Sequence, residues 1–144
     1  MRPRLISDSR VIPAPPGEIF ALLADPSRHP EIDGSGTVQQ LLSDPGPMQL
    51  GSEFRMAMKI FGCPYKMTNT VVEFEENRLI AWRHWGRHRW RYELDPADGG
   101  TLVTETADYS RTRLRQLIMI VHTPKRLQAS IAATLDNLVK RFTP

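Results

Sequence analysis

The feature that most constrains the fold lies near the C-terminal end of the sequence, where apolar residues recur every three or four positions. Thr123 is a good helix N-cap, and Pro124 suits the first position of a helix. The apolar positions are Leu127, Ile131, Leu135, Leu138 and Phe142. This spacing predicts one long amphipathic helix from Thr123 to Phe142, whose apolar face must be buried against another element.

Most of the preceding sequence has a period of two, which is typical of half-buried strands. The predicted strands are 5–12, 37–43, 53–60, 65–75, 79–85, 88–95 and 101–109. Their separators are short and rich in turn-forming residues, at 44–47, 62–64, 76–77, 86–87 and 96–100. Connections this short favour antiparallel neighbours.

The segment between the first two strands predicts short helices instead, because six of the twelve prolines fall in the first thirty residues and break the chain there. One helix is expected over 18–24 and a second helical turn over 27–32. The elements together predict an α+β fold, with a curved antiparallel sheet of about seven strands wrapped around the long C-terminal helix. A bent sheet and a helix cannot meet along their whole length, so an apolar cavity is expected between them.

Composition limits the classes of protein to consider. The chain has 144 residues, 40% of them apolar, which predicts a single domain over 1–144. Cys63 is the only cysteine, and no apolar run resembles a signal peptide or a membrane span, so a cytoplasmic protein is expected. A net charge of +3 is too small to indicate nucleic-acid binding on its own.

Four segments carry a resemblance to a known family: 11–26, 79–83, 90–94 and 98–106. The sequence Val-Ile-Pro-Ala-Pro-Pro-Gly-Glu-Ile-Phe-Ala-Leu-Leu-Ala-Asp-Pro of the first segment resembles the START-related helix-grip superfamily (SRPBCC), and the branch resembles the polyketide cyclase/dehydrase-like proteins of bacteria. The resemblance implies a helix-grip fold that holds sterols, lipids, polyketides, hormones or other apolar molecules, with catalysis in a minority of members. The chain departs from the family pattern at Ile32, where an aromatic residue is usual.

The segment 82–91 concentrates three tryptophans, four arginines and two histidines. Such a mixture could bind single-stranded nucleic acid. Strand alternation, however, puts Trp90 and Tyr92 on one face and Arg89 and Arg91 on the other. We therefore interpret the segment as a hairpin with its aromatic side chains toward the core or cavity, and no nucleic-acid partner is expected.

The titratable residues leave both a structural and a chemical role open. His84 and His88 are expected near the hairpin end as partly exposed turn residues, and His29 as a surface cap near Asp33. Each of the three could instead contact a ligand or transfer a proton. The catalytic candidates are His29, His84, Tyr92 and Tyr109. Two imidazoles are too few for a zinc site, so neither a metal nor another cofactor is expected.

The segment 111–126 contains five basic residues, no acid and a five-residue apolar run. It could form a transient contact with a membrane surface. The alternative is that 117–121 covers the mouth of the cavity as part of the core.

The sequence thus predicts binding of a small or medium apolar molecule, ring-containing or lipid-like, between the sheet and the last helix. The expected lining residues are Phe20, Met56, Met58, Trp82, Trp90, Tyr92, Ile131 and Leu135. Tyr92 or His84 could supply a polar anchor. The alternative function is a polyketide cyclase, aromatase or dehydratase that acts by substrate positioning and proton transfer, and the lesser alternative is lipid delivery at a membrane surface.

Overall fold

The computed structural model describes residues 5–43, 45–84, 88–112 and 123–144. The elements in chain order are β1 (Leu5–Ile12), α1 (Pro16–Leu23), the 3-10 helix η1 (Pro26–Arg28), α2 (His29–Ile32), β2 (Val38–Leu41), β3 (Glu53–Ile60), β4 (Cys63–Glu75), β5 (Leu79–Arg83), β6 (Arg89–Ala97), β7 (Gly100–Asp108) and α4 (Pro124–Phe142). The predicted order of strands and helices is therefore confirmed.

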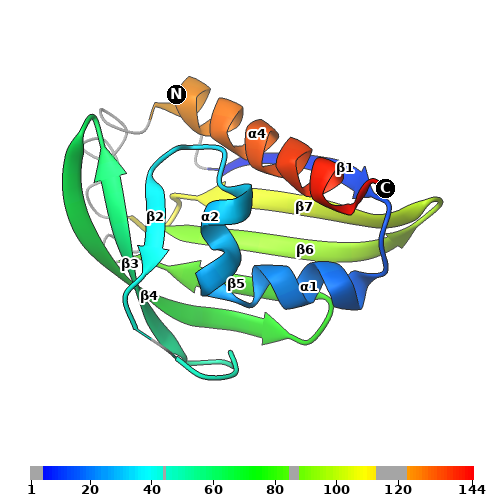
Figure 1. Ribbon diagram of the computed structural model, residues 1–144, viewed down its shortest axis with the longest axis horizontal. Coiled ribbons are helices and arrows are strands. Elements are labelled where there is room, and N and C mark those ends of the chain that lie inside the picture. Colours follow the sequence, from blue (N-terminus) through cyan, green and yellow to red (C-terminus); the bar gives the residue numbers. More distant parts are fainter. Residues whose placement is uncertain (1–4, 44, 85–87, 113–122) are drawn as a thin grey trace.

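The strands form one seven-stranded antiparallel sheet in the order β1-β7-β6-β5-β4-β3-β2. Consecutive strands from β2 to β7 are neighbours, and only β1 crosses over to pair with β7. Figure 1 shows β2 and β3 at a steep angle to β5, β6 and β7, with β4 bending from the direction of β3 into that of β5, while α1, α2 and α4 lie across the same face of the sheet. This arrangement is the helix-grip fold that the sequence predicts.

Helix α4 begins as the sequence indicates. The Oγ1 of Thr123 accepts a hydrogen bond from the backbone N–H of Arg126 at 3.1 Å, and Pro124 opens the first turn. The stripe of apolar residues is buried, and the helix packs chiefly on β1. Burial of this face, rather than intrinsic helix propensity, supplies most of the stability of such a helix.

The hairpin between β3 and β4 is tighter than the sequence indicates. The predicted turn at 62–64 is wrong, because Cys63 and Pro64 already pair with Ile60 and Lys59 in the ladder. The turn consists of Phe61 and Gly62, with φ angles of 50° and 78°. Two successive positive φ angles are typical of a two-residue hairpin turn. The strands β3 and β4 therefore remain paired up to the residues that flank this turn. Phe61 consequently stands at the tip with 71% of its surface exposed.

The β6–β7 hairpin likewise shortens the predicted turn at 96–100, because β6 continues to Ala97 and β7 begins at Gly100. Gly100 has a φ of 150°, and a Cβ at this position would overlap the carbonyl oxygen of Ile12. The close approach joins the end of β1 to the start of β7. Glycine is therefore required here for space as well as for conformation.

We expect Gly100→Ala to lower the free energy of unfolding by about 3 kcal/mol, because the new methyl group must push β1 away from β7. Gly99→Ala is the matched control, since Gly99 has a φ of 86° but no atom within 4 Å of the added Cβ. It should cost only about 1 kcal/mol, from backbone strain. Urea unfolding measures both, and equal losses would contradict the proposed clash.

Candidate ligand-binding cavity

A cavity of about 120 Å³ lies between the concave face of the sheet, the loop after α2 and one flank of α4. An engineered apolar cavity of about 150 Å³ accepts benzene, so the space is on the scale of one aromatic ring. It is smaller than the roughly 300 Å³ at which drug-sized ligand sites begin. The volume thus sets the size of molecule that enters without moving the wall.

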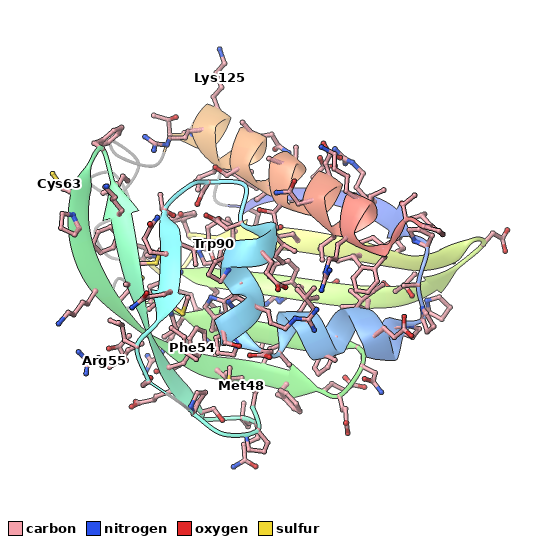
Figure 2. All side chains as sticks on the ribbon, viewed as in Figure 1. Met48, Phe54, Arg55, Cys63, Trp90 and Lys125 are labelled. Atoms are coloured by element: carbon pink, nitrogen blue, oxygen red, sulfur yellow. The ribbon has the colours of Figure 1, made fainter. Side chains whose placement is uncertain are left out.

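Aromatic rings and thioethers form much of the cavity wall. Phe54, Met56 and Met58 come from β3, and Trp82 and Trp90 face each other across the β5–β6 pair. The ring of Phe54 meets that of Trp82 edge-on, with 5.7 Å between centroids and 78° between planes. Edge-to-face pairs of this kind hold the rings in fixed orientations, which gives the wall a defined shape. Figure 2 labels Trp90 next to α2 and Phe54 below it, near the base of β3.

Of the eight residues expected to line the cavity, five are on its wall: Met56, Met58, Trp82, Trp90 and Tyr92. Phe20, Ile131 and Leu135 are not. Phe20 packs edge-on against Phe74 at 5.6 Å, and Ile131 and Leu135 are completely buried within the core. The placement of these three is a correction to the prediction.

The correction for Ile131 and Leu135 follows from how α4 is seated. The centre of its apolar stripe packs against the sheet, mainly on β1. The cavity meets the flank of the helix, at Leu127, Ser130 and Thr134. Periodicity identifies the buried face of a helix but does not distinguish its solid contact from the part that borders a void.

His29 lies on the cavity wall and is not the surface cap that the sequence indicates. Its ring stacks on Trp82, with 5.0 Å between centroids and 20° between planes. Its Nε2 is 2.8 Å from the carbonyl oxygen of Leu23, which can only accept, so Nε2 donates. Burial lowers the pKa of His29, and the imidazole is therefore neutral near pH 7. The sequence predicts a helical turn over 27–32 but not which of its side chains is covered.

His84 and His88 are also buried, contrary to the prediction of partly exposed turn residues. Their rings are 4.3 Å apart, and His88 stacks almost parallel on Tyr109 at 5.1 Å. The backbone N–H of His84 donates to the carbonyl oxygen of His88 at 3.1 Å, which extends the β5–β6 pairing by one step. All three side chains border the cavity. Every catalytic candidate from the sequence, including Tyr92, thus lies on the same wall.

Glu105 is the site residue that sequence reasoning missed. It is 2% exposed, borders the cavity from β7 and lies directly across from Tyr92 on β6. Val103 and Ala107, two positions away on either side, are completely buried. The period of two in 101–107 places Glu105 on this inner face, so the signal was present in the strand pattern.

Burial raises the pKa of Glu105 well above its ordinary value, and the charge of Asp33 acts in the same direction. A hydrogen bond from the Tyr92 hydroxyl opposes that shift but does not cancel it. Burial is also the main reason that the pKa of Tyr92 is raised well above its usual value. Burial thus favours the uncharged form of both side chains.

The loop after α2 is fixed to α4 at a point where only glycine fits. A Cβ on Gly34 would lie 2.5 Å from the Cβ of Ala133, and the Gly34 N–H donates to Thr134 Oγ1 at 2.9 Å. Asp33 caps the loop by accepting hydrogen bonds from Ser35 and Val38. This contact places Asp33 and Ser35 on the cavity wall.

The remaining predictions concern charge and partners. Arg89 and Arg91 pair with Glu73, with the Arg91 Nη2 at 2.8 Å from Glu73 Oε2. Within the described ranges, no three His, Cys, Asp or Glu side chains are grouped to hold a metal ion. No helix in the described part of the chain is long and apolar enough to cross a membrane. Most of the basic segment 111–126, namely 113–122, lies outside the described residues.

Glu105→Gln should change how stability depends on pH. Because the folded protein binds the Glu105 proton more tightly than the unfolded chain does, this proton stabilises the fold fully below the unfolded pKa of about 4.3, and the benefit is lost as pH rises toward the folded pKa. The wild type should therefore lose stability relative to Glu105→Gln as pH rises from about 4.3 toward the folded pKa, by up to about 1.4 kcal/mol per pH unit.

Urea unfolding of both proteins across this pH range measures the difference. Glu93→Gln is the control, because the Glu93 side chain is 49% exposed and the difference from wild type should stay nearly constant. A constant difference for Glu105→Gln would show that Glu105 is ionised in the folded protein like an ordinary carboxyl.

Comparisons with known proteins agree with this architecture. "Uncharacterized protein Rv0088" of Mycobacterium tuberculosis is 44% identical over 108 residues, which cover 74% of this chain and 48% of that protein, so the chain spans about half the length of the curated relatives it matches. Protein CV1439 of Chromobacterium violaceum superimposes with a TM-score of 0.75 at 20% identity, over 99% of each chain. Major latex-like protein 151 of Panax ginseng gives 0.73 at 15% identity, over 97% of each. The family model described as "Polyketide cyclase / dehydrase and lipid transport" matches residues 4–143. The chain therefore belongs to this family.

Proposed function

We propose that this protein binds a small apolar, ring-containing molecule in the cavity between the sheet and α4. The observation that carries the proposal is a hollow of about 120 Å³ walled by aromatic rings and methionines inside an otherwise packed core. Protein interiors are close-packed, and a void costs dispersion energy and hydrophobic free energy. A ligand that fills the space recovers that free energy, and the family's description as cyclase, dehydrase and lipid transport supports an apolar guest.

The cavity wall can also adapt to somewhat larger ligands. Met56 and Met67 face each other across the β3–β4 pair, and Met58 follows on the same face of β3. Thioether side chains have several low-energy conformations and adapt to guests of different shape. We therefore expect single-ring molecules to bind without rearrangement and two-ring molecules to bind by displacing methionine side chains.

A thermal-shift series with p-xylene and naphthalene tests this function. A ligand present at about 100 times its Kd adds roughly 2.7 kcal/mol to stability. For a chain of this size, that corresponds to a rise in Tm of about 5 °C or more. Quenching of the fluorescence of Trp82 and Trp90, both on the cavity wall, gives the affinity independently.

Ser130→Phe should abolish this binding, because Ser130 borders the cavity and its replacement puts a benzyl group into the space that the ligand needs. Ala129→Phe is the matched control, since Ala129 is the adjacent exposed position of α4. The control should bind like wild type. If no ligand raises the Tm of the wild type, or if both variants bind equally, the cavity is not the binding site.

A second function, a cyclase or dehydratase acting on a polyketide-like substrate, is favoured by one observation. His29, Tyr92 and Glu105 all border the cavity with pKa values shifted by burial, and shifted pKa values cluster at sites of proton transfer. The test is incubation with a β-hydroxy ketone and detection of water loss by mass spectrometry. Glu105→Gln and His29→Gln should each slow a genuine reaction at least tenfold while leaving ligand binding measurable.

A further inference from the structure

Two residues of the cavity wall each carry a buried polar atom that lacks a hydrogen-bond partner among the described residues, Oε1 of Glu105 and Oδ1 of Asn69. Both residues are almost fully buried, at 2% and 3% exposure. They come from different strands, β7 and β4. Native proteins nearly always satisfy buried polar atoms, with protein groups, water or a ligand. Two such atoms on one apolar cavity therefore call for a hydrogen-bond donor in the cavity, from water or from the polar part of a guest.

The surroundings of Glu105 determine which form of the carboxyl a guest meets. Tyr92 lies across from it on β6, and Asp8 lies across from it on β1 but pairs with Arg10 at 2.8 Å. Among the described residues, no lysine or arginine forms an ion pair with Glu105. Arg126 is the one lysine or arginine among the described residues of the cavity wall. Its guanidinium lies 4.5 Å above the ring of Phe61.

Neither His29 nor Asp33, both on the cavity wall, supplies a counter-charge to Glu105. Burial keeps His29 neutral by lowering its pKa, and Asp33 disfavours a second negative charge. His84, His88, Tyr65 and Tyr109 complete the titratable groups of the described wall. A carboxyl in such a place is stable as the uncharged acid.

The chemistry of these oxygens selects the guest. The amide oxygen of Asn69 can only accept a hydrogen bond, and the carboxyl Oε1 offers a lone pair in either protonation state. A guest must therefore bring a hydrogen-bond donor, and a hydroxyl group is the simplest uncharged one. A hydrocarbon would leave both acceptors unsatisfied, and an anionic guest would bring more acceptors and a charge close to Asp33.

The structure assigns this cavity to an uncharged aromatic alcohol of one or two rings, packed against the adjacent Trp82 and Tyr92 rings with its hydroxyl group hydrogen-bonded to Glu105. The assignment rests on the proposed function, since it names the class of apolar molecule that the cavity takes. The wall supplies flat surfaces for the ring, and the acceptor oxygens give direction to the hydroxyl group.

The test compares p-cresol with p-xylene, two molecules of nearly equal size that differ in one hydroxyl group. Isothermal titration calorimetry of wild type should show p-cresol binding at least fivefold more tightly. Glu105→Leu should remove this preference by weakening p-cresol and leaving p-xylene unchanged or tighter. Glu105→Gln retains an acceptor oxygen and should keep most of the preference, and Glu93→Gln should keep all of it. Melting curves establish that each variant is folded.

The outcomes distinguish failure of the proposed ligand-binding function from failure of the assignment of an aromatic alcohol. Failure of both molecules to bind wild type would overturn the proposed function and this inference with it. Equal binding of both, unaffected by Glu105→Leu, would leave the cavity as an apolar site and overturn the role of Glu105. Tighter binding of benzylamine, lost in Glu105→Gln, would show an ionised carboxylate that selects cations. Preference for benzoate would overturn the assignment to an uncharged guest.

Discussion

The contact of α4 with β1 at one end of the sheet is the interaction on which the rest of the structure depends. The apolar stripe of the helix is buried chiefly on β1, and β1 in turn is joined to β7 by eight register pairs. The other end of the sheet, β2 to β4, turns at a steep angle (Figure 1). Because one rigid helix cannot follow both parts, a hollow is left where its flank faces the turned strands.

This geometry also explains why polar groups are found inside. Strand alternation puts every second residue of β4 and β7 on the concave face, whether that face is packed or hollow. In the packed part these residues are apolar, as Val71 and Val103 show. Asn69 and Glu105, two positions away, border the hollow instead. A polar side chain is tolerable there because a guest can complete its hydrogen bonds.

The same low-polarity surroundings control protonation. His29, Tyr92 and Glu105 differ in chemistry, yet burial moves each of their pKa values toward the uncharged form. Burial thus favours the uncharged forms of these three hydrogen-bonding side chains. Such side chains suit both the orientation of a neutral guest and the exchange of protons with it, which is why the two proposed functions involve the same residues. Membership of the family establishes the fold, whereas these side chains decide the chemistry.

Most helices and strands of this protein could be predicted from its sequence, because the patterns that indicate them are local along the chain. The capped stripe from Thr123 to Phe142 and the period of two in the strands predict the elements and, with the resemblance of 11–26, the helix-grip arrangement. Strand alternation also identified Trp82, Trp90 and Tyr92 as inward-facing.

Only the tertiary structure decided which buried residues border the hollow. The burial of His29, His84 and His88, and the placement of Ile131 in the solid core, depend on how α4 and α2 are seated on the sheet. The clearance that Gly34 provides against Ala133 is equally a property of two segments about a hundred residues apart. Periodicity indicates which face of a helix or strand is covered. A cavity depends on how segments far apart in the sequence pack together, and no periodic pattern along the chain indicates it.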